Sequence, residues 1–161
     1  MTISLRAISN EELEDLANGV APAGAASALL IQGLPPPFVA RRSLEQLAGG
    51  KWNGRDFNFF MLRDVDGRIV GACGFKHPPQ DGRVEVGYAV SPCCRQQGIA
   101  TKAIGLLTRV AFERDGLRQV LAQIDPANIA SQGVVRKLGF IDGGTVLDED
   151  GEPAMQWLLE V

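Results

Sequence analysis

The sequence predicts a single mixed α/β domain with a largely antiparallel sheet, and three observations lead to this class. The chain has 161 residues, which is the usual size of one domain. Hydrophobic residues make up 45% of the chain and charged residues 22%, as is typical of a globular protein with one core. Alternating and helical segments follow one another in the order strand, two helices, three strands, helix, strand, helix and two strands.

The chain is expected to open with a strand and a short helix. Residues 2–8, TISLRAI, alternate between apolar and polar positions, which predicts the strand. Ser9 and Asn10 are residues that commonly cap helices, and acidic residues follow them in the first turn, where the helix dipole favours negative charge. We therefore expect the first helix to begin at this point.

An uncharged stretch rich in Ala, Gly and Pro follows at residues 18–40. It predicts a partly helical connection, which is either a packed linker or a wall or lid of a pocket. Residues 41–50, RRSLEQLAGG, then predict a second helix that ends at Gly49 or Gly50, because glycine is favoured just beyond a helix C-terminus.

The middle of the chain predicts three antiparallel strands. Residues 57–75, FNFFMLRDVDGRIVGACGF, read as two strands around Asp66–Gly67, a dipeptide typical of hairpin turns. Residues 83–90, RVEVGYAV, alternate again and predict a third strand, which residues 76–82 connect to the second. The three strands are expected to form a meander.

The last third predicts two helices and three strands. Helical periodicity begins at Ile99 and stops at Gly116, and RQVLAQI at residues 118–124 predicts a strand. Asp125 and Pro126 end this strand, and Asn128 can cap the next helix. Residues 139–147 and 154–161 predict two closing strands around an acidic turn.

Composition excludes several classes of function. A net charge of −3 argues against a nucleic-acid scaffold, which would carry a clustered basic excess. Three cysteines and one histidine, His77, provide neither a disulfide framework nor a zinc-ligand set. The sequence holds no apolar run long enough for a membrane span, and its acidic N-terminal region does not resemble a signal peptide. We expect a cytoplasmic protein that binds no metal, nucleic acid or membrane.

The turn after the third meander strand has the features of an anion site. Gly98 lies at the mouth of the helix that begins at Ile99, and glycine lets the backbone approach a phosphate closely. Arg95 and Thr101 add donors near the four free amides of the helix N-terminus. The alternative is an ordinary tight turn with a surface arginine, since short glycine motifs are weak signals.

Two segments resemble the GNAT superfamily of N-acetyltransferases. RQQGIA, residues 95–100, is similar to the Arg/Gln-x-x-Gly-x-Gly/Ala signature of that superfamily, and residues 84–104 resemble its fourth strand, phosphate turn and third helix. NIASQGVVRKLGF, residues 128–140, resembles its Asn-x-x-Ser and Lys-Leu-Gly-Phe segment. The combination looks like the Rim-type (RimJ/RimL-like) branch, which acetylates protein N-termini. The likeness covers residues 57–140, whereas the first 55 residues match only in element order.

The resemblance implies acetyl-CoA as the acetyl donor. It implies a splayed pair of central strands, with the pantetheine arm in the gap and the pyrophosphate on the amides of the turn. Asn128 would contact the pantetheine side, and a strand amide near Ala89 and Val90 would stabilise the developing oxyanion. The donor-binding residues that the resemblance implies are Tyr88, Ala89, Val90, Arg95, Gln96, Gln97, Gly98, Ile99, Ala100, Thr101 and Asn128.

Two residues are candidates for catalysis. Glu85 stands in an otherwise apolar strand, where a carboxylate is costly unless it is paired or used, so it is either a base or one half of a cross-strand ion pair with Arg83 or near Lys76. The tyrosine that many GNAT members use as an acid aligns with Val135 here. Ser131 is the candidate in its place, unless it only completes the helix N-terminus. Tyr88 is a further candidate or a core residue, and alternation places it opposite Glu85.

The acceptor has three interpretations. The Rim-type likeness favours a protein or peptide N-terminal amine, a small amine such as a polyamine, amino acid or antibiotic is the alternative, and a non-catalytic acyl-CoA sensor is the third. We expect residues 1–55 to form the acceptor side, 56–140 the acetyl-CoA-binding core and 141–161 the closing strands of a single 1–161 domain. Similar proteins are often homodimers.

Overall fold

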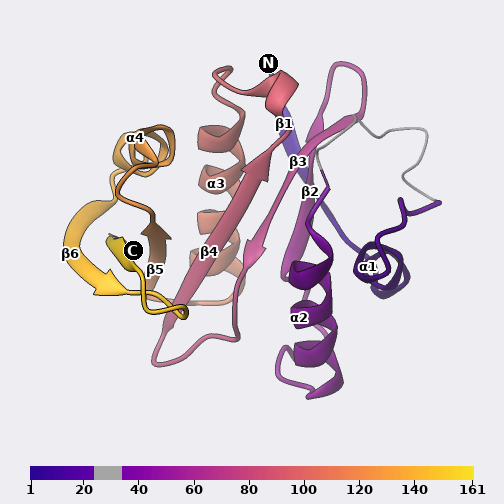
Figure 1. The fold of residues 1–161 in the computed structure, drawn as a ribbon, viewed down its shortest axis with the longest axis horizontal. Helices are drawn as coiled ribbons and strands as arrows, with labels where there is room; N and C mark the ends of the chain where they lie inside the picture. Colours follow the sequence, from indigo (N-terminus) through magenta and orange to yellow (C-terminus); the bar gives the residue numbers. More distant parts are fainter. Residues whose placement is uncertain (24–33) are drawn as a thin grey trace.

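The computed structural model describes residues 1–23 and 34–161, which form one open seven-stranded sheet with helices on both faces (Figure 1). The strand order is β1-β2-β3-β4-β5-β7-β6, and only the β4–β5 pair is parallel. The strands are β1 Ile3–Ala7, β2 Asn58–Arg63, β3 Arg68–Phe75, β4 Arg83–Val90, β5 Gln119–Ile124, β6 Ile141–Leu147 and β7 Pro153–Glu160. The α-helices are α1 Asn10–Ala17, α2 Pro37–Ala48, α3 Ile99–Arg109 and α4 Ile129–Lys137. A short 3-10 helix, η1 Pro92–Cys94, precedes α3, and one turn of π-helix, η2 Val110–Arg114, follows it. The predicted mixed α/β class and element order are confirmed.

The predicted start of the second helix is wrong by four residues. Helix α2 begins at Pro37, whereas the sequence placed residues 37–40 in the preceding connection. Proline suits the first helical position, because its φ is already helical and that position has no intrahelical use for an N–H. Residues 24–33 of the predicted connection lie outside the described residues, so its interpretation as a linker, wall or lid stays a prediction.

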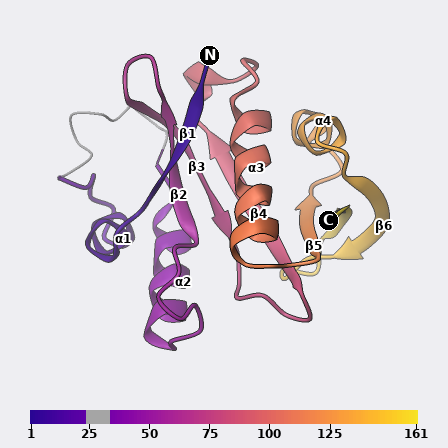
Figure 2. The same cartoon turned by 180° about the vertical axis from the view of Figure 1, so that it is seen from behind.

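The two faces of the sheet carry separate apolar clusters. Helix α3 covers one face with Ile99, Ala103, Ile104 and Leu107, all of them buried. Helices α1 and α2 cover the other face of β2 and β3, where Phe60 and Ile69 are fully buried (Figure 2). None of the described helices is long and apolar enough to cross a membrane.

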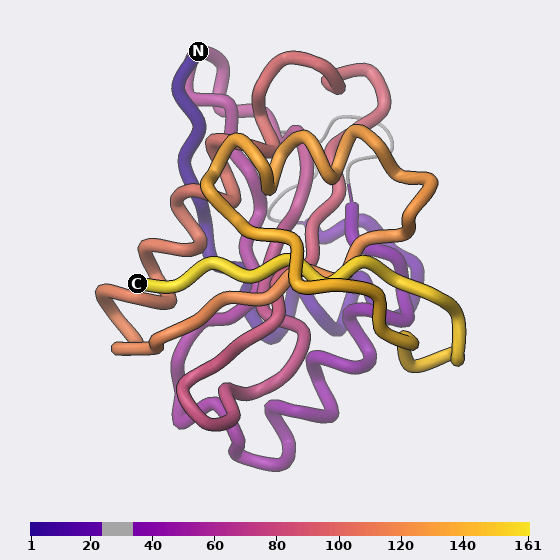
Figure 3. The backbone as a smooth tube through the Cα atoms, turned by 90° about the vertical axis from the view of Figure 1, so that its left-hand side faces the viewer, coloured from indigo at the N-terminus to yellow at the C-terminus, as the bar shows by residue number. Residues whose placement is uncertain are grey.

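The sheet consists of two antiparallel halves that meet at β4 and β5. Strands β1 to β4 form one half, and β5, β7 and β6 form the other. Figure 3 shows the second half from the side, with β7 in yellow crossing in front and α4 in orange above it. The parallel junction consists of three residue pairs, Arg83–Gln119, Val84–Val120 and Glu85–Leu121. Beyond this short junction the two strands separate, as the resemblance implied.

Helix α1 is held by the predicted cap. The Ser9 side chain accepts a bond from the Glu12 amide at 3.1 Å, and the Glu12 carboxylate accepts from the Ser9 amide at 3.0 Å. Arg6 adds an ion pair to Glu12 at 3.0 Å. Burial by itself would raise the pKa of Glu12, but the Ser9 amide and Arg6 outweigh it and hold that pKa below its ordinary value of 4.5.

A Glu12→Gln variant is expected to show this charge as pH-dependent stability. A lowered folded-state pKa stabilises the fold above the unfolded-state value of 4.5, and the contribution is lost as pH falls through the lowered pKa. The free energy of unfolding should therefore drop more in the variant at pH 7 than at pH 3, measured by urea denaturation. Glu14→Gln, at an exposed position of the same helix, is the control. An equal decrease in the free energy of unfolding at both pH values would contradict the expectation.

Candidate active site

The turn between β4 and α3 exposes the start of the helix. Gln96 and Gly98 both adopt left-handed backbone conformations, with φ of 62° and 77°. Helix α3 follows at once, and the Lys102 amide is the first to bond within it, to the Gly98 carbonyl at 3.2 Å. The amides of Ile99 to Thr101 precede that bond, as at every helix N-terminus. They are available to an anion, and the turn lies where the predicted anion site was placed.

Arg95 closes this turn against the end of β4. Its Nε donates to the Val90 carbonyl at 3.3 Å, while the residue as a whole stays exposed. This bond ties the guanidinium to the end of β4, four residues before helix α3 begins. Positive charge and free amides consequently lie together at one end of β4.

A cleft opens where β4 and β5 separate. It has a volume of about 190 Å³ and lies between the second halves of both strands and the start of α4. Figure 1 shows the two strands diverging beneath α4. The lining residues are Lys76, Val86, Gly87, Tyr88, Ala122, Gln123, Ile124, Asp125, Asn128 and Ser131.

The hydrogen-bond pattern of β4 determines which backbone groups face this cleft. The Glu85 carbonyl accepts from Lys76 at 2.8 Å and the Ser91 amide donates to Val70 at 2.8 Å, both toward β3. Because the direction alternates along an antiparallel strand, the amides of Tyr88 and Val90 point away from β3, to the side on which the cleft opens. The amide of Ala89 points toward β3, so the expected backbone contact with pantetheine would be made by Tyr88 and Val90 and not by Ala89.

Three predicted residues come together at the cleft. The Tyr88 hydroxyl lies 3.4 Å from the Ser131 carbonyl and spans the gap from β4 to α4. Asn128 caps α4, since its Oδ1 accepts from the Ser131 amide at 3.1 Å. Burial raises the pKa of Tyr88, so its hydroxyl stays protonated and can donate a proton or hydrogen bond. Both candidate acids, Tyr88 and Ser131, thus line one cleft.

Glu85 lies beside the cleft and is 7% exposed. Its carboxylate pairs with Lys76 at 2.9 Å, and His77 Nε2 lies 3.9 Å from the other carboxylate oxygen. The ion pair offered as an alternative is therefore present, with Lys76 as the partner, whereas Arg83 bonds to Gln119. Alternation places Glu85 on the opposite face of β4 from Tyr88, as predicted. A buried carboxylate beside a cation suits both an ion pair and a base.

The family profile of the acetyltransferase (GNAT) domain matches residues 2–141. The chain belongs to the GNAT acetyltransferase family. Members of this family take the acetyl group from acetyl-CoA. Two curated relatives carry N-acetyltransferase names: YjdG of Bacillus subtilis is 34% identical over 85 residues, and p20 of Bacillus licheniformis is 26% identical over 110 residues. The matches span 52% and 68% of this chain, and 51% and 62% of those relatives.

Solved GNAT structures share the fold across the whole domain. A ribosomal-protein-S5-alanine acetyltransferase of Vibrio fischeri superposes with a TM-score of 0.72 at 18% identity, covering 99% of this chain and 93% of that one. RimJ of Mycobacterium smegmatis, solved with CoA-disulfide, gives 0.70 at 17% identity and covers 99% and 82%. AAC(6')-Ib, solved with parmomycin and acetyl-CoA, gives 0.70 at 16% identity and covers 99% and 94%. At these identities the likeness concerns the fold alone.

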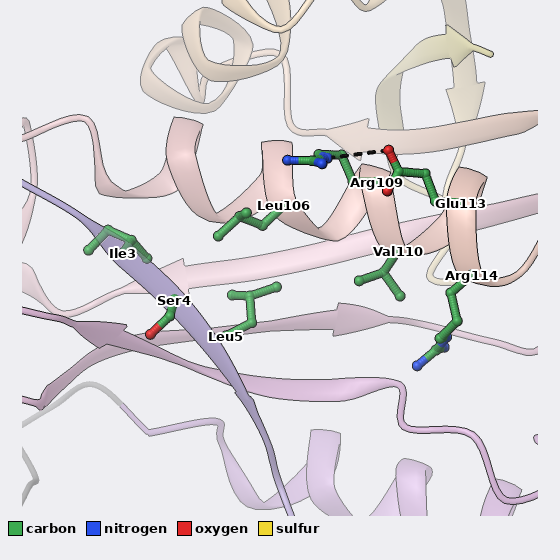
Figure 4. A pocket seen from close by; sticks show the side chains of 8 residues that line it. All are labelled: Ile3, Ser4, Leu5, Leu106, Arg109, Val110, Glu113 and Arg114. Atoms are coloured by element: carbon green, nitrogen blue, oxygen red, sulfur yellow. Dashed lines mark hydrogen bonds and ion pairs between the residues drawn. The ribbon is translucent and has the colours of Figure 1, made fainter.

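The GNAT domain has a second, larger hollow on its far side. It measures about 420 Å³ and lies between β1 and the end of α3 (Figure 4). Apolar side chains such as Leu5 and Val110 line it together with Arg114 and the exposed Arg109–Glu113 pair, whose atoms lie 3.5 Å apart. It includes none of the predicted site residues, so the smaller cleft remains the candidate active site.

Cys93 is the most reactive thiol that the GNAT domain is expected to offer. Hydrogen bonds from Ser91 at 3.3 Å and Cys94 at 3.5 Å lower the pKa of Cys93, which is exposed next to the turn. Burial raises the pKa of Cys94, and raises that of Cys73 to about 12. Because the thiolate is the nucleophile, substoichiometric iodoacetamide near neutral pH should alkylate Cys93 first.

Peptide mass spectrometry would locate this alkylation. The Cys93→Ser variant should lose the fast phase of labelling and keep the slow one. Equal labelling of Cys93 and the buried Cys73 would contradict the assignment.

Proposed function

We propose that this GNAT domain transfers the acetyl group of acetyl-CoA to a primary amine, and that its natural acceptor is the N-terminal amine of a protein or peptide. The observation that carries the proposal is the cleft between β4 and β5. A turn that opens onto the N-terminus of α3 lies at the end of β4, and a buried carboxylate lies beside the cleft. These are the parts that direct attack of an amine on a thioester requires.

On the donor side, both the turn and the open edge of β4 would bind acetyl-CoA. The amides of residues 96–101 and the Arg95 guanidinium suit the pyrophosphate, since a helix N-terminus and arginine both favour phosphate. The cleft-facing amides of Tyr88 and Val90 suit the amide groups of the pantetheine arm. Asn128 lines the same cleft from α4. These residue roles are our assignment.

On the chemical side, the acceptor amine must first lose a proton. For an α-amino group with a pKa of about 7.7–8.0 this costs about 1 kcal/mol at neutral pH, whereas a lysine near 10.4 costs about 4–5 kcal/mol. A modest base therefore suffices for a protein N-terminus, and we assign this role to Glu85, directly or through one water. The Val90 amide would stabilise the oxyanion, and Ser131 or Tyr88 would protonate the departing thiolate.

The charges at the cleft favour an acceptor with a single amine. Asp125 is the one carboxylate that lines the cleft in the described part of the chain, Glu85 is already paired, and Lys76 adds a positive charge. A polycation would need several unpaired carboxylates. The Vibrio fischeri structure is named for acetylation of a ribosomal-protein alanine, which agrees with this choice. AAC(6')-Ib, solved with parmomycin, keeps a small amine as the second candidate.

We further propose a division of the domain by task. Residues 1–55 would form the acceptor side through α1 and α2, residues 56–140 the acetyl-CoA-binding core, and residues 141–161 the closing strands. This division places acceptor specificity where the likeness to the family motifs is weakest.

An acceptor screen tests the proposal. Release of free CoA from acetyl-CoA would be followed with peptides that begin with alanine or serine, the same peptides with a blocked N-terminus, spermidine and an aminoglycoside. We expect acceleration by the free peptides and none by the blocked ones. Acceleration by the small amines alone would favour the second candidate. Acetyl-CoA binding without acceleration by any amine would favour a sensor and overturn the proposal.

A further inference from the structure

Lys76 occupies a position that neither the family match nor the sequence motifs explain. It follows β3 directly, and its backbone is fixed on both sides. Its amide donates to the Glu85 carbonyl at 2.8 Å, and its carbonyl accepts from the Gln46 side chain at 2.8 Å. The backbone position from which the Lys76 side chain extends is therefore fixed by the sheet and by α2.

The side chain extends from this position over β4 to the candidate active site. Its stem passes over Gly87, where an added Cβ would come within 3.0 Å of the Lys76 Cε. The absence of a side chain at Gly87 thus makes room for the stem. The Nζ reaches the Glu85 carboxylate at 2.9 Å, and Lys76 lines the cleft together with Tyr88 and Ser131. The sequence contains four lysines, all of them described, and Lys76 is the one that lines this cleft.

We propose that Lys76 is itself an acceptor, so that the domain acetylates its own Lys76 from acetyl-CoA. The proposal rests on the proposed function and adds an internal amine to it. The primary amine, the carboxylate assigned as its base and the cleft assigned to the thioester are already together in one chain. With its amine held in place, Lys76 needs no encounter with a separate acceptor molecule once acetyl-CoA is bound.

The reaction balances as an ordinary acetyl transfer. A bond forms between the Lys76 Nζ and the acetyl carbon, and the bond between that carbon and the CoA sulfur breaks. The Lys76 ammonium gives up two protons: one passes through Glu85 to solvent, and the other ends on the thiolate of CoA. The product amide carries no charge, so Glu85 loses its cation partner.

Incubation of the intact chain with acetyl-CoA, followed by peptide mass spectrometry over time, tests the proposal. We expect acetylation at Lys76 at least about tenfold faster than at Lys51, Lys102 and Lys137. At saturating acetyl-CoA the first-order rate constant of labelling should be independent of protein concentration, as an intramolecular step requires. In Lys76→Arg, which keeps a cation beside Glu85, no site should replace the lost label. Glu85→Gln should slow the labelling about a hundredfold, within the usual contribution of a general base.

Two results would overturn the proposal. The first is equal labelling of the four lysines that persists in a Gly98→Asp variant, because this is chemical acetylation by free acetyl-CoA. The second is a first-order rate constant that rises in proportion to protein concentration, because this is transfer between molecules. If wild-type chain binds acetyl-CoA in calorimetry and Lys76 stays unmodified, this proposal fails alone. If acetyl-CoA does not bind at all, the proposed function fails with it.

Discussion

Replacing Gly98 by aspartate is expected to abolish acetyl-CoA binding, with a loss of at least about a hundredfold in affinity, which corresponds to about 2.7 kcal/mol. The substitution puts a carboxylate at the helix N-terminus that we assign to the pyrophosphate. It also forces a non-glycine residue to a φ of 77°, although the added Cβ meets nothing within 4 Å. Repulsion of the phosphates should dominate, because a single left-handed residue costs only about 1–2 kcal/mol.

Isothermal titration of wild-type and variant protein would measure this loss. Gly98→Ala is the matched control, because it carries the same backbone strain without the charge and should retain most of the affinity. Arg95→Glu should also weaken binding strongly, whereas Arg109→Glu makes the same charge change at the other end of α3 and should not. Wild-type affinity in a folded Gly98→Asp variant would leave RQQGIA as a structural turn.

The second large effect is expected at Glu85. Glu85→Gln keeps the shape of the buried side chain and removes the base, so kcat for an acceptor amine should fall about a hundredfold, within the range of general-base catalysis. KM for acetyl-CoA should change little, because Glu85 is outside the set of side chains that line the cleft. Steady-state kinetics with the best acceptor from the screen would separate the two constants.

The ion pair with Lys76 provides the competing explanation for a buried carboxylate at this position, in which Glu85 takes no part in catalysis. If Glu85 only anchors Lys76, the glutamine variant should retain kcat and lose stability in urea unfolding instead. Glu113→Gln removes a carboxylate whose side chain is 69% exposed and serves as the control for the general effect of charge. Unchanged kcat in Glu85→Gln would therefore show that Glu85 has a structural role and not a catalytic one.

Local patterns predicted most of this fold. Alternation and helical periodicity placed the seven strands and four α-helices of the described residues in order, because apolar residues recur on the buried face of each element. The Ser9 and Asn128 caps are present because their hydrogen bonds are formed within a few residues of sequence. The start of α2 escaped prediction because Pro37 was taken as part of the proline-rich connection, although proline is also favoured at the first helical position.

Non-local contacts explain what the sequence could not resolve at the candidate site. Alternation correctly separated Glu85 from Tyr88, but no local pattern joins Tyr88 to Ser131 across 43 residues. Similarly, Lys76 and Arg83 were both considered near Glu85, and only the β3–β4 register decides for Lys76. The β4–β5 pairing joins residues that are 36 positions apart in the sequence, so no single segment encodes its length.

The short junction between β4 and β5 has a consequence for the cooperativity of unfolding. Each half of the sheet is joined internally by long antiparallel ladders, whereas the halves share three residue pairs, the hydrogen bonds of Arg118 and Gln119 to Gly82, and the apolar core under α3. Regions joined by few hydrogen bonds tend to open as separate cooperative units below the global free energy of unfolding. The amides near the junction should therefore exchange through an opening that parts the halves, with each half still folded. A ligand that bridged the cleft would link the unfolding of the two halves. Its binding would then stabilise the whole sheet against opening, and not only the residues of the cleft.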